Sequence, residues 1–140
     1  MITFQVVFDA ADPHQAVAFW AAALGYQVED HTEIVDGLMA SGHLPAQAVV
    51  DLDDRRRGFA DVTAAADPTG QRPRLFFQRV PERKSTKNRV HLDLHVGAER
   101  VDAEVERLQA LGATWAWETV DRGPRNVTMQ DPEGNELCLS

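Results

Sequence analysis

The sequence predicts an α+β protein in which a βαβββ unit occurs twice and forms a curled mixed sheet. Two repeated patterns support this class. In each half of the chain an alternating strand precedes an amphipathic helix, and an Asp-Pro-x-Gly turn lies near the end of each half. The length of 140 residues allows one domain, or two very small ones that share a core.

The first half opens with a strand and a helix. Apolar residues alternate with mainly polar ones, which predicts a strand with one buried face. These apolar residues are Ile2, Phe4, Val6 and Phe8. Asp12 is a suitable N-cap, Pro13 suits the first helical position, and Gly25 is a typical stop. We therefore expect a helix between Pro13 and Gly25, with Trp20 on its buried face.

The second half repeats this order. The apolar face of its first strand is formed by Val90, Leu92, Leu94 and Val96. Val101, Val105 and Leu108 then follow helical spacing in a charged surround, and the helix is expected to end at Leu111-Gly112.

Each half is expected to close with a β-hairpin. The turn from Asp67 to Gly70 precedes the apolar run Leu75-Phe76-Phe77, and the turn from Asp131 to Gly134 precedes Leu137-Cys138-Leu139. Asp-Pro-x-Gly is favourable chemistry for a type I turn between two strands. Each half therefore reads strand, helix, strand and hairpin.

The first half is longer by an insert at about residues 32–58. The Leu-Gly pairs lie 87 residues apart, from 25 to 112, whereas the Asp-Pro pairs lie 64 apart, from 67 to 131. Within the insert we expect a helix after Pro45, with Val49, Val50 and Leu52 buried; it covers either a pocket or a sheet edge. We assign 1–80 to the first module, 81–88 to a linker and 89–140 to the second module, together one structural domain.

Composition limits the partners and the compartment. The net charge is −8, from 22 acidic and 14 basic side chains, which disfavours nucleic acid. The longest apolar run has nine residues, from Ala16 to Leu24, too few to span a membrane. Cys138 is the single cysteine, so no internal disulfide forms. We expect a cytoplasmic protein. Seven basic residues within 72–89 are either a solvated linker or an attraction for an anionic small molecule.

Alternation also predicts a polar face on each strand. The side chains opposite the apolar stripes include Gln5 and Asp9, Phe76 and Gln78, His91 and Asp93, and Glu136 and Cys138. On a curled sheet these faces line one cavity; the alternative is an ordinary solvent-facing sheet.

Several stretches match a known pattern in order and spacing. They are FDAADP, FW and LG, then PRLFFQRVPE, KNRVHLDLHV and DPEGNELCL. Together they resemble the vicinal oxygen chelate superfamily of glyoxalase I, extradiol dioxygenases and the bleomycin and fosfomycin resistance proteins, and most of all its glyoxalase-like domain branch. The resemblance implies a cup around a divalent metal, whose ligands, typically His or Gln, Glu, His and Glu, fall here on Gln5, Gln78, His91 and Cys138.

Two of these positions depart from the family pattern, because an amide and a thiol replace both carboxylates. His91 and His95 are about 13 Å apart along a strand and cannot share an ion, whereas His91 and Asp93 can. A thiolate at Cys138 would favour zinc. We expect no metal cofactor; the alternative is one ion of zinc, iron, manganese or nickel.

Two further features leave alternatives open. Cys138 is a nucleophile if His91 lowers its pKa, and otherwise a small buried side chain. Trp115 and Trp117, on one face of the strand after the second helix, are either core residues or a stacking platform for a ligand.

The sequence thus predicts a glyoxalase-like protein that binds a small organic molecule in its cup. The expected pocket residues are Gln5, Phe76, Gln78, His91, Asp93 and Cys138. The alternative is a metal-dependent lyase, isomerase or dioxygenase in which Glu136 or Asp93 supplies the missing carboxylate. By analogy with the resistance proteins we expect a homodimer; the alternative is a monomer whose two modules form the cup.

Overall fold

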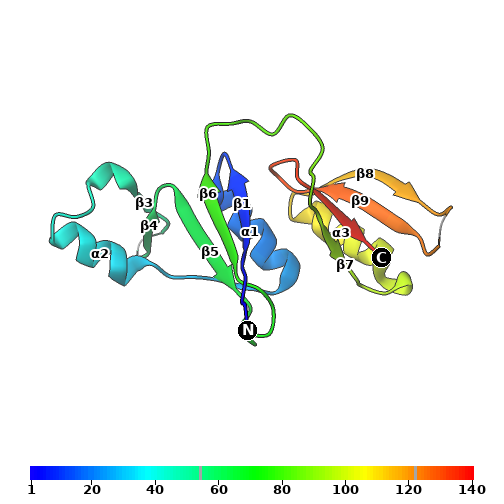
Figure 1. Ribbon diagram of the computed structural model, residues 1–140, viewed down its shortest axis with the longest axis horizontal. Helices are drawn as coiled ribbons and strands as arrows, with labels where there is room; N and C mark the ends of the chain where they lie inside the picture. The colour runs from blue at the N-terminus through cyan, green and yellow to red at the C-terminus, as the bar shows by residue number, and fades with distance from the viewer. Residues whose placement is uncertain (54, 122) are drawn as a thin grey trace. The chain divides into compact units, whose positions relative to one another are not determined.

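The computed structural model describes residues 1–53, 55–121 and 123–140. The chain forms two compact units, Met1–Pro81 and Glu82–Ser140, and the fold is α+β as predicted (Figure 1). In each unit one helix packs against a four-stranded sheet. No helix in the described part of the chain has the length and apolar character needed to cross a membrane.

The sheet of the first unit has the strand order β1-β6-β5-β2. β1 runs parallel to β6, while β5 is antiparallel to both β6 and β2. The strands span Val6–Ala10 for β1, Gln27–Val28 for β2, Val62–Ala66 for β5 and Leu75–Arg79 for β6. Val7 is the partner of Phe76 and Asp9 that of Gln78, so these side chains share the face that does not carry the aromatic core.

Helix α1, Pro13–Leu24, covers the other face of this sheet. Asp12 caps it by accepting hydrogen bonds from the N–H groups of His14 and Gln15, and Gly25 ends it in the left-handed conformation with φ 69°. The predicted helix and its stop are therefore confirmed. The ring of Trp20 lies 5.0 Å from that of Phe8 and is fully buried, as expected.

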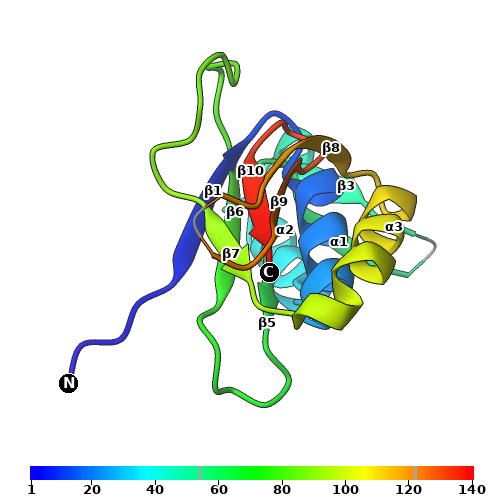
Figure 2. The same cartoon turned by 90° about the vertical axis from the view of Figure 1, so that its right-hand side faces the viewer.

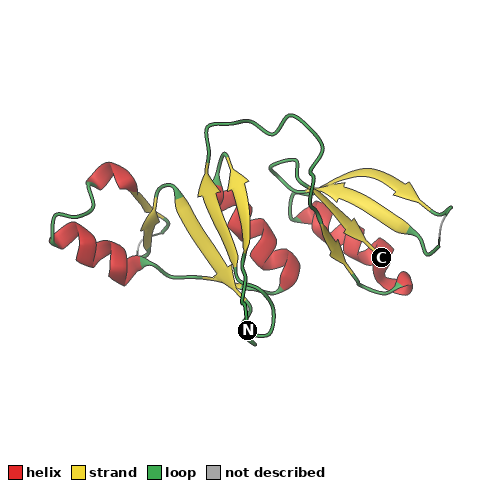
Figure 3. Ribbon diagram, in the orientation of Figure 1, coloured by secondary structure: helices red, strands yellow, loops and turns green. Residues whose placement is uncertain are grey.

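The insert differs from the prediction. Its helix is α2, Thr32–Ala40, whereas the stretch after Pro45 forms only the short helix η1, Ala46–Ala48, before strand β3, Val49–Asp51. β3 pairs antiparallel with β4, Arg57–Phe59, in a small sheet (Figure 3).

The prediction of a helix after Pro45 is wrong, because the backbone of Val49–Asp51 pairs with β4 instead. Val49 and Val50 are β-branched and favour a strand. Asp53 accepts hydrogen bonds from the N–H groups of Arg55 and Arg56, which stabilises the turn into β4. The ring Nε2 of His14 lies 2.8 Å from the carbonyl of Phe59, so the hairpin is joined to α1.

The second unit repeats the topology of the first. Its sheet has the order β7-β10-β9-β8, with β7 parallel to β10 and the other pairs antiparallel. The strands are β7, Leu92–Leu94; β8, Thr114–Thr119; β9, Asn126–Gln130; and β10, Glu136–Leu139. Helix α3, Val101–Ala110, follows the short helix η2, Ala98–Arg100. The duplicated βαβββ order is thus confirmed.

The first strand of each unit is shorter than the alternation predicts. Ile2 is 95% exposed, Phe4 73% and Val90 81%. β1 begins at Val6 because its neighbour β6 begins at Leu75, the partner of Val6. Figure 2 shows the N-terminal residues extending beyond β1.

Candidate functional site

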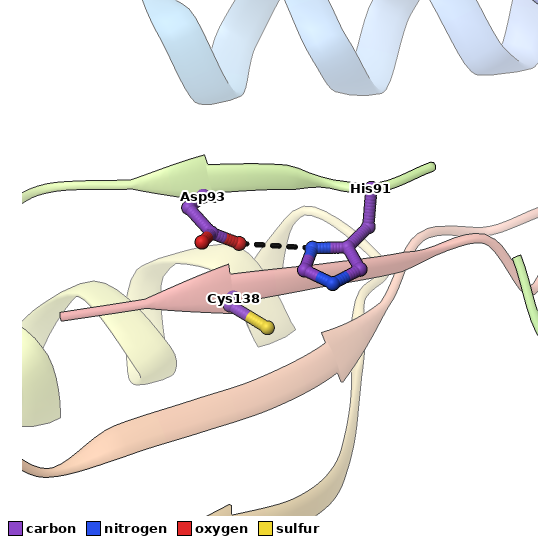
Figure 4. A group of neighbouring side chains, drawn as sticks. All are labelled: His91, Asp93 and Cys138. Atoms are coloured by element: carbon purple, nitrogen blue, oxygen red, sulfur yellow. Dashed lines mark hydrogen bonds and ion pairs between the residues drawn. The ribbon is translucent and has the colours of Figure 1, made fainter. Parts of the chain in front are cut away.

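The second unit brings three predicted site residues together. Asp93 on β7 is the cross-strand partner of Cys138 on β10, so both side chains lie on the same face. His91, two residues before Asp93, turns toward them, and its Nδ1 lies 2.9 Å from Asp93 Oδ1 (Figure 4). One ligand atom from each of the three residues lies within 4.8 Å of the others. His91 and Asp93 are open to solvent, whereas Cys138 is buried.

The environment of Cys138 disfavours the thiolate. Burial raises the pKa of the Cys138 thiol, and the charge of Asp93 raises it further. The hydroxyl of Thr128, 3.4 Å from Sγ, opposes this effect only in part. The pKa of Cys138 is therefore raised, against the hypothesis that His91 lowers it, and the imidazole of His91 is bonded to Asp93.

Glu136 does not join this cluster, although it is the next polar residue on the same strand. Its buried carboxylate accepts a hydrogen bond of 2.9 Å from Asn88 N–H, and Lys84 Nζ lies 3.6 Å away. Burial alone would raise the pKa of Glu136, but the Asn88 hydrogen bond and the nearby lysines lower it below its usual value. Of the two carboxylates considered, Asp93 is therefore the one beside His91 and Cys138.

In the first unit, the amide of Gln5 is held by an arginine. Arg74 Nη1 donates a hydrogen bond of 2.9 Å to Gln5 Oε1. The same guanidinium makes two bonds, of 2.6 and 2.7 Å, to the carboxylate of Glu29. This pairing lowers the pKa of Glu29. The local sequence gives no sign of the Glu29–Arg74 pair, because the partners are 45 residues apart.

Gln78 and Phe76 complete the polar face of this sheet. Gln78 Nε2 donates a hydrogen bond of 2.8 Å to Asp9 Oδ1, and the half-buried ring of Phe76 lies 5.4 Å from the guanidinium carbon of Arg74. The structure thus brings Gln5, Phe76 and Gln78 to one sheet, and His91, Asp93 and Cys138 to the other. The pocket predicted to join all six stays a prediction.

The two exposed tryptophans of β8 lie on different faces. Trp115 is the partner of the core residue Met129, and Trp117 that of Thr128, because a β-bulge interrupts the pairing between them. Trp115 is 51% exposed and Trp117 is 40% exposed. The expectations of a shared face and of a buried pair are both wrong, since simple alternation cannot foresee a bulge. Trp117 instead shares the face of Thr128 and Cys138.

The insert contains a hollow of about 560 Å³ of its own. It is lined by Thr32, Asp36, Asp51, Leu52, Asp53, Arg55 and Arg57. Arg57 joins Asp36 and Asp51 across it, at 3.1 and 3.3 Å. Because Arg57 is already paired with Asp36 and Asp51, the hollow is a weaker candidate for a ligand site than the sheet faces.

The sequence matches a known protein family over nearly its whole length. A family model described as a glyoxalase-like domain matches residues 5–140, which is nearly the whole length. This chain belongs to the glyoxalase-like domain family. No curated protein matches its sequence.

Solved structures of the wider superfamily share the fold of this glyoxalase-like protein. A glyoxalase/bleomycin resistance protein/dioxygenase family enzyme from Burkholderia phytofirmans PsJN is 18% identical with a TM-score of 0.61, over 96% of this chain and 94% of that one. A mutant of the fosfomycin resistance protein FosX from Listeria monocytogenes, in complex with manganese(II) and dihydroxypropylphosphonic acid, is 14% identical with a TM-score of 0.60, over 99% and 90%. A hypothetical protein from S. aureus is 17% identical with a TM-score of 0.59, over 99% and 96%. These identities show the fold alone.

The side chains of this glyoxalase-like protein match the metal ligands that the resemblance implies at Gln5 and His91, but not at Gln78 and Cys138. Gln5 and Gln78 are neutral amides bonded to Arg74 and Asp9, and Cys138 has a raised pKa where a carboxylate is expected. A hard ion such as manganese prefers oxygen ligands. His91, Asp93 and Cys138 offer nitrogen, oxygen and sulfur instead, a donor set that suits zinc.

Proposed function

We propose that this glyoxalase-like protein binds a small organic molecule on the polar faces of its sheets and does so without the usual metal of the family. The observation that carries the proposal is the state of the residues at the implied ligand positions. Of the four, two are amides that already make hydrogen bonds, one is a thiol whose pKa burial raises, and the fourth is His91, which is bonded to Asp93. Neutral ligands attract a divalent ion less than two carboxylates do.

The chemistry of the second unit supports binding. Its polar face offers an exposed imidazole and carboxylate, a buried hydroxyl and an exposed indole, and all but the imidazole lie on strands. A few polar groups beside an aromatic surface are typical of sites for small organic molecules. FosX from L. monocytogenes holds a small phosphonic acid on the same fold. We further propose a cytoplasmic protein that acts without nucleic acid, as a monomer or a homodimer.

A ligand screen tests this proposal directly. The full chain, labelled with nitrogen-15 and treated with chelator, is exposed to a library of small acids, aromatics and amides while its amide and indole signals are followed by NMR. We expect some compounds to shift signals of β7 and β10 beside Asp93 and Cys138. Shifts that appear only after zinc is added, or no shifts with any compound, would contradict the proposal.

A second function is favoured by one observation, the cluster of His91, Asp93 and Cys138. These residues would hold a zinc ion, which would act as a Lewis acid on two adjacent oxygens of a substrate. The chain would then be a metal-dependent lyase, isomerase or dioxygenase.

The second function predicts that His91→Ala abolishes zinc binding. The matched control is His95→Ala, because His95 directly follows β7 as His91 directly precedes it, but it bonds to Ser140, with Nδ1 2.9 Å from Oγ. If calorimetry gives the same zinc affinity for both variants and the parent chain, the hypothesis of a metal-dependent enzyme is contradicted.

A further inference from the structure

Four side chains form a row straight across the sheet of the second unit. Trp117 on β8 is the partner of Thr128 on β9, Thr128 is the partner of Cys138 on β10, and Cys138 is the partner of Asp93 on β7. Cross-strand partners lie on one face of a sheet, about 4.8 Å apart. This central row therefore leads from an indole to a carboxylate over about 14 Å.

The two ends of the central row carry different chemistry. At the β7 end, the carboxylate of Asp93 is bonded to the imidazole of His91. At the β8 end, the indole of Trp117 is 40% exposed, and Nζ of Lys87 lies 5.8 Å from the centre of its ring. Among the described residues no carboxylate lies within ion-pair distance of Lys87, whereas Lys84, three residues earlier, is paired with Glu136.

These features select a ligand class. An exposed indole offers a flat apolar surface on which another aromatic ring can stack. Nζ of Lys87 lies over that ring, near the outer limit of about 6 Å for a cation–π contact, so the ring holds the cation only weakly. Its positive charge attracts an anionic group of a ligand and repels a cationic one. The seven basic residues within 72–89 thus include one, Lys87, that is placed to act on a ligand.

We infer that the ligand of the second unit is a planar aromatic anion, whose ring stacks on Trp117 and whose anionic group pairs with Lys87. This inference rests on the proposed function and names its ligand class. Thr128, next to the indole in the central row, is buried, and its hydroxyl lies 3.4 Å from Cys138 Sγ, so it supports the floor of the site and does not contact the ligand. At the other end of the central row, Asp93 and His91 would hydrogen-bond to polar groups of a longer ligand.

The test uses 2-naphthoate as a probe and follows the three indole N–H signals of the full chain by NMR. Trp20 is buried in the first unit and Trp115 lies on the opposite face of β8, so both are internal references. We expect 2-naphthoate to shift the Trp117 signal and to bind about fivefold more tightly than the neutral 2-naphthalenemethanol. Decahydro-2-naphthoate, which cannot stack, should bind more weakly than 2-naphthoate.

Variants separate the two contacts. Trp117→Leu should weaken 2-naphthoate binding about tenfold, whereas the matched change Trp115→Leu should leave it within about twofold. Lys87→Gln should remove the preference for the anion over the alcohol. The matched change Arg83→Gln, at an exposed basic residue of the same segment, should retain that preference.

Three outcomes would overturn the inference. Equal binding of naphthoate and alcohol excludes the role of Lys87. Shifts at Asp93 and Cys138 without a shift of the Trp117 indole exclude the stacking contact, while the proposed function itself stands. If none of the three probes shifts the Trp117 signal but dilution of the protein does, another copy of the chain covers this face. The proposed function fails separately, if the wider library shifts no signal on either sheet.

Discussion

Burial raises the pKa of Cys138, and its neighbours in the central row modify it: Thr128 lowers it and Asp93 raises it. A thiol beside an imidazolium becomes reactive, but the imidazole of His91 is bonded to Asp93, and the carboxylate lies on the strand next to the thiol. The cluster thus disfavours the thiolate, because burial raises the pKa of Cys138 and the charge of Asp93 adds to that effect.

We predict slow alkylation of Cys138. Because burial and Asp93 raise the pKa of its thiol, iodoacetamide should react at neutral pH more slowly than with free cysteine. Asp93→Asn removes a negative charge, so the rise of rate with pH should move to lower pH. Mass spectrometry of timed samples measures both rates. A rate above that of free cysteine would restore the nucleophile hypothesis.

The Glu29–Arg74 pair predicts a loss of stability in acid. The folded-state pKa of Glu29 is lowered from its ordinary value of 4.5, so the pair stabilises the fold above that value and loses its effect as pH falls through the lowered pKa. Glu29→Gln should cost about 1 kcal/mol at neutral pH, and clearly less at about pH 3.

Urea unfolding at both pH values measures these costs. Glu33→Gln, at an exposed carboxylate of α2, is the control and should cost little at either pH. An equal cost of Glu29→Gln at both pH values would show that the side chain stabilises by packing and not by charge.

At the residue scale, alternation predicted which face most site residues occupy. It placed His91, Asp93 and Cys138 on one face, as the register of β7 and β10 now shows for the last two. It could not find Glu29, whose partner is far along the chain, or separate Trp115 from Trp117, because a bulge changes the face without a local sequence sign.

Helix α1 shows that elements with strong end signals can be predicted. Asp12 accepts two backbone N–H groups that would otherwise have no partner in the helix. Asp12→Ala should therefore lower the free energy of unfolding by about 1 kcal/mol. Asp12→Ser, which retains a capping oxygen, should recover most of the loss in urea unfolding. Equal losses for both variants would show that the cap is not the stabilising contact.

The insert shows why other elements could not be predicted. Its strands β3 and β4 have only three residues each, and their stability depends on pairing with one another and on His14 from α1. Gly58 also allows this close approach, because a Cβ there would lie 3.3 Å from His14 Cε1. Such contacts are tertiary and leave no period in the sequence.

At the scale of the whole molecule, the fold could be predicted because the βαβββ pattern occurs twice in the sequence. Both units place a parallel pair beside two antiparallel strands and one helix. The family match to residues 5–140 agrees with this architecture. The fold alone does not give the chemistry, because Gln78 and Cys138 stand where the resemblance implies carboxylates.

The central claim is that this glyoxalase-like fold binds its ligand without a resident metal. The most direct test is the divalent metal content per chain, measured by elemental analysis on untagged protein purified without chelators. We predict metal well below one equivalent, with none retained after incubation with zinc, iron, manganese or nickel and gel filtration. Near one equivalent of a single metal, lost in His91→Ala and retained in His95→Ala, would contradict the claim and establish the metal-dependent alternative.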